Sequence, residues 1–145
     1  MATSVQIVFD CADPDQLGAF WAAALHYRQQ EPPPGFASWE AFLKDRGVPE
    51  EEWNSANAII DPEKAGPRIY FQKMDTPKPR KNRVHLDLNV SGGGRVPLDE
   101  RVKRITAEVE RILRLGATKQ KVWEEPDGGY FVVMLDPEGN EFCIQ

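Results

Sequence analysis

An internal repeat is the feature that most constrains the fold of this chain. Residues 61–72 read DPEKAGPRIYFQ and residues 136–145 read DPEGNEFCIQ, so both stretches begin with Asp-Pro-Glu, continue through a glycine and end in glutamine. Proline fixes φ at the second position of a turn and glycine tolerates a positive φ, so each copy predicts a tight turn that leads into a short strand. The sequence therefore predicts two similar modules.

The first module is predicted to open with a strand at residues 5–10 and to continue into a helix. Asp13 is a suitable N-cap for this helix, and Pro14 suits its first position. Apolar residues at helical spacing then form the stripe that is expected to be buried: Leu17, Phe20, Trp21 and Leu25.

The second module repeats this order, with a strand expected at residues 84–89 and a helix after it. The helix is predicted from its apolar stripe and from Gly116, a typical left-handed cap. Two stretches of alternating apolar residues, 118–124 and 130–135, predict a hairpin joined by a turn at residues 126–129. The apolar stripe of the helix consists of Leu98, Val102, Ile105, Val109, Ile112 and Leu113.

The first module also contains an insertion at residues 31–56, between its second and third strands. The insertion begins with three prolines and a glycine, which exclude a regular element there. Ser38 is positioned to cap a short helix that Gly47 would end. The insertion either packs over an end of the sheet or forms a lid or pocket wall. The helix is expected to bury Trp39, Phe42 and Leu43.

Charge and composition narrow the class of partner. The net charge of -5 argues against a nucleic-acid partner, because binding phosphates requires a basic surface. No apolar run approaches the roughly 20 residues that cross a bilayer, so no membrane partner is expected. The amino terminus lacks the features of a signal peptide, which predicts a cytoplasmic protein in which Cys11 and Cys143 are reduced thiols. A small-molecule ligand is the partner we expect.

Three stretches of sequence resemble the vicinal-oxygen-chelate superfamily, the glyoxalase, bleomycin resistance and dioxygenase proteins. They are DCADP at residues 10–14, KNRVHLDL at residues 81–88 and DPEGNEFC at residues 136–143. Together with the tandem modules, they are similar to the glyoxalase-like branch. The resemblance extends over essentially the whole chain.

This resemblance implies an α+β fold in which two tandem βαβββ modules form a cleft of curled, mixed sheet. Residues 1–145 are then a single glyoxalase-like domain. Module one covers about residues 4–76 and contains the insertion, and module two covers about residues 82–145. Because one scaffold hosts many activities, the resemblance implies the fold more narrowly than the function.

The resemblance also implies four positions at which metal-dependent relatives hold a metal ion, one in the first and one in the last strand of each module. In this sequence the positions fall on Gln6 and His85 in the first strands and on Tyr70 and Cys143 in the last strands. Both carboxylates of the usual ligand set are missing, so we expect no cofactor. A divalent metal such as Zn or Fe, held by His85 and Cys143, is the alternative.

Other residues on the same strand faces extend the candidate binding site. Gln72 and Glu141 lie on the same faces as Tyr70 and Cys143 and are candidate ligand-binding residues. His85 and Asp87 share one face and are the candidate catalytic pair, with the imidazole as a general base. The simpler alternatives are a hydrogen-bonded core histidine at position 85 and a small buried thiol at position 143.

Two classes of function follow. The first is a metal-free protein that binds a small aromatic or acidic organic molecule in the cleft between the modules. The second is a lyase, isomerase or dioxygenase-type enzyme that uses an altered metal set or has His85 as its acid and base. In either case we expect a homodimer, because small modules leave hydrophobic sheet edges to cover.

Overall fold

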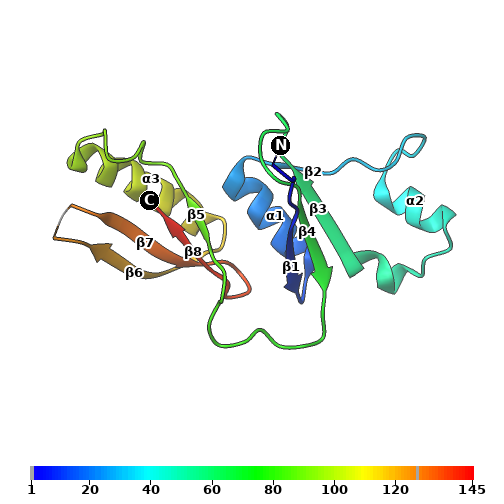
Figure 1. The fold of residues 1–145 in the computed structure, drawn as a ribbon. Coiled ribbons are helices and arrows are strands. Elements are labelled where there is room, and N and C mark those ends of the chain that lie inside the picture. The colour runs from blue at the N-terminus through cyan, green and yellow to red at the C-terminus, as the bar shows by residue number, and fades with distance from the viewer. Residues whose placement is uncertain (1, 127) are drawn as a thin grey trace. The chain divides into compact units, whose positions relative to one another are not determined.

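The computed structural model describes residues 2–126 and 128–145, and the chain divides into two units, Met1–Pro77 and Lys78–Gln145 (Figure 1). Each unit consists of one four-stranded mixed sheet and one long helix. In both units the chain runs strand, helix and then three strands. The predicted α+β fold with two tandem βαβββ modules is confirmed.

In the first unit the strand order is β1-β4-β3-β2, in which β1 is parallel to β4 and the other pairs are antiparallel. The parallel pair joins the first and last strands of the unit, which places residues far apart in the sequence side by side. The elements are β1 (Ile7–Cys11), α1 (Pro14–Leu25), β2 (Arg28–Gln29), α2 (Trp39–Asp45), the 3-10 helix η1 (Glu50–Ser55), β3 (Ala56–Ile60) and β4 (Ile69–Lys73).

Helix α1 covers one face of this sheet and begins where the sequence predicts. The Asp13 carboxylate accepts a hydrogen bond from the backbone N–H of Gln16 at 3.1 Å, and Pro14 is the first helical residue. The helix ends at His26, whose left-handed φ of 58° breaks the helical pattern. Trp21 packs on Phe9 with ring centroids 5.4 Å apart. The buried residues of α1 are Pro14, Leu17, Gly18, Phe20, Trp21 and Ala24.

The insertion contains the predicted short helix, capped by Ser38, but the expected burial of its apolar side chains is wrong. No residue of α2 is buried. The contacts of its aromatic side chains are mainly with other residues of the insertion. Phe42 makes edge contacts with Phe36 and with Trp39, at centroid distances of 5.1 and 5.8 Å. The indole N–H of Trp39 reaches back towards β2 and donates to the Gln30 carbonyl at 2.7 Å.

In the second unit the strand order is β5-β8-β7-β6, with β5 parallel to β8 and the other pairs antiparallel. This order reproduces that of the first unit, because β5 and β8 correspond to β1 and β4. The predicted hairpin strands agree with the structure residue for residue. The elements are β5 (Leu86–Leu88), α3 (Leu98–Arg114), β6 (Thr118–Glu124), β7 (Tyr130–Leu135) and β8 (Glu141–Ile144).

Helix α3 buries a narrower stripe than the sequence predicts. Its buried residues are Ile105, Val109 and Ile112, whereas Leu98 and Leu113 are 44% and 38% exposed at the two ends of the helix. Gly116 follows the helix with a φ of 109°, as predicted for a left-handed cap. None of the described helices has the combination of length and apolar character that crossing a membrane requires.

The first strand of each unit starts later than the sequence predicts. Val5 and Val84 are 71% and 78% exposed, and the strands begin at Ile7 and Leu86. In the first unit the start is set by the partner strand, because β4 begins at Ile69 and its first pair with β1 is that of Ile69 with Ile7. Gln6 and His85 therefore lie directly before their strands. In the predicted hairpin turn, Asp127 lies outside the described residues.

Candidate functional site

Each sheet has one face that packs against a helix and one face that does not. In the second unit Leu88, Phe142 and Ile144 are buried in the core. Because side chains alternate along a strand, their neighbours point to the opposite face. We call this face the second polar face; its residues are His85, Asp87, Asn89, Glu141, Cys143 and Gln145.

The strand register shows which residues of the two units are equivalent. Asp87 pairs with Cys143 in the second unit, and Val8 pairs with Tyr70 in the first. Cys143 and Tyr70 each follow the turn glycine of their repeat by the same number of residues, and His85 and Gln6 each precede the paired strand residue by two. The same position therefore holds different chemistry in the two units, because Asp87 corresponds to Val8.

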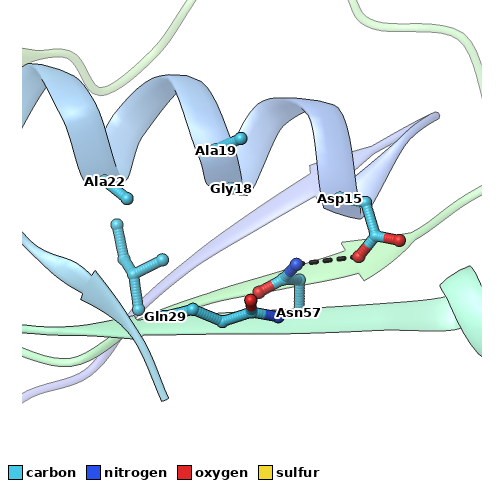
Figure 2. A pocket seen from close by; sticks show the side chains of 7 residues that line it. Asp15, Gly18, Ala19, Ala22, Gln29 and Asn57 are labelled. Atoms are coloured by element: carbon cyan, nitrogen blue, oxygen red, sulfur yellow. Dashed lines mark hydrogen bonds between the residues drawn. The ribbon is translucent and has the colours of Figure 1, made fainter. Parts of the chain in front are cut away.

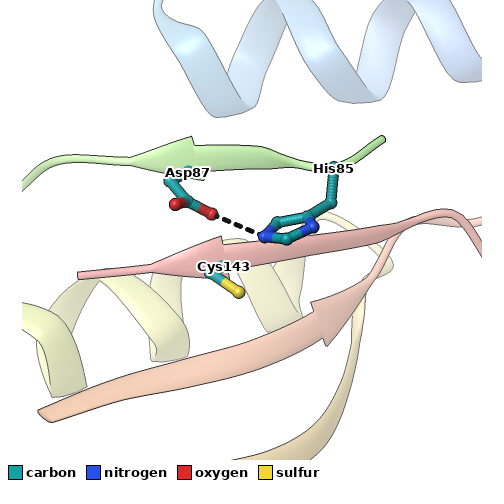
Figure 3. A group of neighbouring side chains, drawn as sticks. All are labelled: His85, Asp87 and Cys143. Atoms are coloured by element: carbon teal, nitrogen blue, oxygen red, sulfur yellow. Dashed lines mark ion pairs between the residues drawn. The ribbon is translucent and has the colours of Figure 1, made fainter. Parts of the chain in front are cut away.

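Three candidate site residues form a cluster on the second polar face. Nε2 of His85 lies 3.2 Å from Oδ1 of Asp87, and both side chains are about half exposed. The ligand atoms of His85, Asp87 and Cys143 all lie within 4.8 Å of one another. Figure 3 shows the imidazole and the carboxylate side by side beneath β5, with the thiol of β8 close to them.

The protonation of Cys143 is set by its surroundings. The pKa of this thiol is raised to about 11, chiefly by burial and in addition by the negative charge of Asp87 and a hydrogen bond to it. The charge of Glu141 acts in the same direction, and that of Lys81 opposes it. At neutral pH the side chain is therefore a neutral thiol that accompanies the carboxylate rather than a thiolate nucleophile.

Polar side chains next to the cluster hold its strands in place. Nε2 of Gln145 donates to Oδ1 of Asn89 at 2.9 Å and approaches Oδ2 of Asp87 at 3.5 Å. Glu141 pairs with Lys81 at 2.5 Å, so its charge is compensated within the unit. Asp87 thus carries the less compensated negative charge on this face.

An aromatic surface adjoins the polar residues. Val133 of β7 pairs with Cys143, and alternation places Phe131 on the same face. The Phe131 ring stacks on Trp123 with centroids 6.1 Å apart, and the ammonium of Lys121 lies 3.7 Å from the Trp123 centroid. The sequence gave no signal for Phe131, because the choice of face depends on the register with β8.

In the first unit an arginine, Arg68, contacts the two residues at the positions equivalent to His85 and Cys143. Nη1 of Arg68 donates to Oε1 of Gln6 at 2.5 Å, and the guanidinium lies 5.3 Å from the centroid of the Tyr70 ring. Gln6 and Tyr70, both predicted site residues, are thus brought together by Arg68, which the sequence did not single out. Gln72 lies further along β4, where its amide donates to the Met74 sulfur at 3.6 Å.

A cavity of about 220 Å³ lies elsewhere, between α1 and the strands β2 and β3 of the first unit (Figure 2). Nδ2 of Asn57 donates to Asp15 at 2.8 Å, whereas its buried Oδ1 has no hydrogen-bond partner among the described residues. A Cβ on Gly18 would lie 3.2 Å from Cγ of Asn57, a tight contact that the amide could relieve only by shifting slightly. None of the predicted site residues lines this cavity, which lies on the helix side of the sheet.

The family model for the glyoxalase-like domain matches residues 6–145, almost the entire chain. The chain belongs to the glyoxalase-like domain family. This membership confirms the resemblance to the vicinal-oxygen-chelate superfamily. No curated protein matches the chain.

Solved structures support the same fold. A glyoxalase/bleomycin resistance protein/dioxygenase family enzyme from Burkholderia phytofirmans PsJN is 15% identical with a TM-score of 0.58, and the match covers 96% of this chain and 94% of that one. The fosfomycin resistance protein FosX from Listeria monocytogenes, in a mutant form complexed with Mn(II) and a dihydroxypropylphosphonic acid, is 14% identical with a TM-score of 0.60. That match covers 100% of this chain and 90% of the other. At such identities the likeness concerns the fold alone.

The residues of this glyoxalase-like domain do not fit a hard ion such as Mn(II). Such ions prefer carboxylate and carbonyl oxygens, but Tyr70 and Cys143 stand at the last-strand positions. In the first unit the oxygen of Gln6 is already bonded to Arg68, whose fixed positive charge opposes a nearby cation. The three side chains His85, Asp87 and Cys143 suit a borderline ion such as Zn(II) better, provided that the thiol loses its proton.

Proposed function

We propose that this glyoxalase-like domain binds a small organic molecule on the second polar face without the help of a metal. The observation that carries the proposal is the cluster of His85, Asp87 and Cys143 beside the stacked rings of Trp123 and Phe131. Ligand sites typically combine an apolar surface with a few convergent polar groups, and this face offers both.

The imidazole is the group best placed to contact the ligand. If Nε2 carries the proton and donates it to Asp87, the lone pair on Nδ1 is available to accept a hydrogen bond or a proton. Nδ1 makes no hydrogen bond within residues 2–126 and 128–145. An acidic or phenolic ligand group is the natural partner for this atom, and an aromatic ring in the ligand would lie against Trp123 or Phe131.

The second candidate function is catalysis, and two features favour it. The carboxylate of Asp87 would stabilise His85 after it takes up a proton, as an acid and base catalyst requires. Alternatively, the three ligand atoms within 4.8 Å would hold a transition metal, which acts as a Lewis acid when bound.

Ligand titrations of isotope-labelled protein test the binding proposal. The compounds would be phenol, catechol, benzoate and phenylphosphonate, and the signals followed would be the His85 ring, the Trp123 indole and the amide of Cys143. We expect at least one compound to shift all three signals saturably. If no compound shifts them, the proposed site is wrong.

A pair of histidine variants makes this test specific. His85→Gln places on the second unit the residue that Gln6 provides at the equivalent position, so the fold tolerates its size. His26→Asn alters the other histidine, at the end of α1, and asparagine accepts the left-handed φ of that position. Binding should weaken in His85→Gln and stay unchanged in His26→Asn; equal binding in both variants would count against the proposal.

We also propose that the protein is a homodimer. Strand β6 lies at the edge of its sheet, and all of its residues are exposed, including Val122 and Trp123 at 38% and 42%. An exposed apolar edge strand favours pairing with another chain. Sedimentation velocity tests this proposal over protein concentrations of roughly 1 to 100 µM, a range suited to dimers with small interfaces. A monomer at every concentration would contradict it.

A further inference from the structure

We propose that Arg68 is an anion-binding residue and that it holds a carboxylate or another oxyanion group of a ligand on the first unit. This inference rests on the proposed function in one respect, because it names the chemical class of a small-molecule ligand. It concerns a different unit and different residues from the His85 cluster. Its test can therefore fail while the other succeeds.

The position of Arg68 follows from the register of the first sheet. Arg68 and Tyr70 are the two neighbours of Ile69, which is buried under α1. Because side chains alternate along a strand, Arg68 and Tyr70 both point to the opposite face. That face also carries Gln6 before β1 and Gln30 after β2. The guanidinium is therefore on the side of the sheet that α1 does not cover.

Neutral groups hold the guanidinium in place. Its Nε donates to Oε1 of Gln30 at 2.6 Å, its Nη1 donates to Oε1 of Gln6 at 2.5 Å, and its plane lies over Tyr70. Two hydrogen bonds and a ring contact fix a side chain that would otherwise lose considerable rotamer entropy on binding a ligand. The charge is thus positioned in advance.

The charge itself is not compensated within the unit. Within the described part of the chain, Arg68 makes no ion pair, and its Nη2 donates no hydrogen bond. The neighbouring Arg28 on the same face is paired with Glu31 at 2.5 Å. Partial burial removes part of the water that solvates a cation, which costs free energy. The electrostatic attraction of a bound anion offsets this cost.

The uncompensated positive charge is found in the first unit and not at the equivalent position of the second. Counting from the turn glycines, Arg68 corresponds to Glu141, whose charge Lys81 neutralises. Arg68 has no such partner among residues 2–126 and 128–145. A guanidinium with unused N–H donors pairs preferentially with a planar carboxylate or with a phosphate-type oxyanion.

Benzoate and its neutral analogue benzamide are the probes that test this inference. The signals followed would be the Nε–H of Arg68 and the side-chain amides of Gln6 and Gln30 in nuclear magnetic resonance spectra. We expect benzoate to shift all three saturably and benzamide to leave them unchanged. Equal shifts with benzamide would overturn the inference, because recognition would not depend on charge.

Three arginine variants complete the test. Arg68→Met keeps the aliphatic stem and should raise the dissociation constant for benzoate at least about tenfold, since it removes charge-assisted hydrogen bonds. Arg68→Lys should fall between this variant and the wild type and remains informative if Arg68→Met does not fold. Arg28→Met, the matched control, should bind as the wild type does. Unchanged affinity in both Arg68 variants would overturn the inference.

The same spectra separate this inference from the proposed function. Shifts at Arg68 without any shift at His85 would support the anion site and count against the second polar face as the ligand site. Shifts at His85 alone, with Arg68 unaffected, would uphold the proposed function and overturn the anion site.

Discussion

Nε2 of His85 lies 3.2 Å from Oδ1 of Asp87, a contact that the first unit cannot reproduce because Gln6 and Val8 occupy the equivalent positions. The two units thus share one strand order and differ in the side chains on the face opposite the helix. One presents an imidazole, a carboxylate and a thiol, and the other presents an arginine held by amides.

Asp87 should control the titration of Cys143. Burial is the largest cause of the raised pKa, and the carboxylate adds to it by its charge and by a hydrogen bond, so Asp87→Asn should lower that pKa from about 11 but leave it above 9.0. The measurement is thiolate absorbance against pH in a Cys11→Ser background, which leaves one thiol. An unchanged pKa in Asp87→Asn would show that the two side chains do not interact.

The raised pKa of Cys143 also predicts how stability depends on alkaline pH. The folded thiol holds its proton more strongly than the unfolded one, so the stabilisation is present below pH 9 and is lost as the pH rises towards about 11. The free energy of unfolding, from urea titrations in this pH range, should therefore fall more steeply for the wild type than for Cys143→Ala. Parallel slopes would contradict the assigned pKa.

The turn glycines of the two repeats should fail for different reasons when substituted. A Cβ at Gly66 would lie 2.0 Å from the Tyr27 hydroxyl, so Gly66→Ala and Gly66→Asn should both cost about 1–3 kcal/mol through overpacking. Gly139 has open space around it but a φ of 81°. Gly139→Ala should therefore cost about 1 kcal/mol and Gly139→Asn less, since asparagine tolerates that conformation.

Thermal or urea unfolding of the four glycine variants measures these differences. The Tyr27→Phe background is the internal control, because removing the hydroxyl should relieve part of the cost at Gly66 and none at Gly139. Asparagine being better tolerated at Gly66 than at Gly139 would contradict this reading of the two turns.

The N-cap of α1 should contribute a stability that depends on acid pH. A hydrogen bond from the Asn54 side chain, followed by one from the backbone N–H of Gln16, lowers the pKa of Asp13 below 3.8. The stabilisation is therefore present above pH 3.8 and is lost as the pH falls through the lowered value. Asp13→Ala should cost about 1 kcal/mol at pH 7, and this cost should shrink in acid.

A second N-cap provides the control for that prediction. Ser38 caps α2 through a hydroxyl that does not titrate, so the smaller effect of Ser38→Ala should not change between pH 7 and pH 3. If both effects shrink equally in acid, general acid destabilisation and not the titration of Asp13 would be the cause.

The sequence predicted the fold where local signals and the tertiary structure agree. Helix α1 begins at Pro14 as its cap residues indicate, and strands β6 and β7 have the predicted bounds because their alternation is regular and glycines separate them. The first strands were predicted too long. Val5 and Val84 favour strands by type, but no partner strand reaches them.

The candidate site was less accessible to sequence reasoning. Spacing on one strand placed His85 beside Asp87, and the repeat placed Cys143 opposite them, which the register shows. Arg68 was missed because a charged residue after a proline-containing turn usually indicates a solvated surface. Its contacts with Gln6 and Gln30 join residues that are far apart in the sequence and depend on the pairing of the strands.

The elemental metal content of tag-free protein tests the central claim, a metal-free ligand site, most directly. The protein would be measured by mass spectrometry as purified and after incubation with Zn, Fe(II), Ni or Mn followed by desalting, with His85→Ala as the control. The account predicts that no metal is retained near one equivalent and that the wild type and the variant agree. A near-stoichiometric metal that is lost in His85→Ala would contradict it and make the metalloenzyme the better account of the cluster.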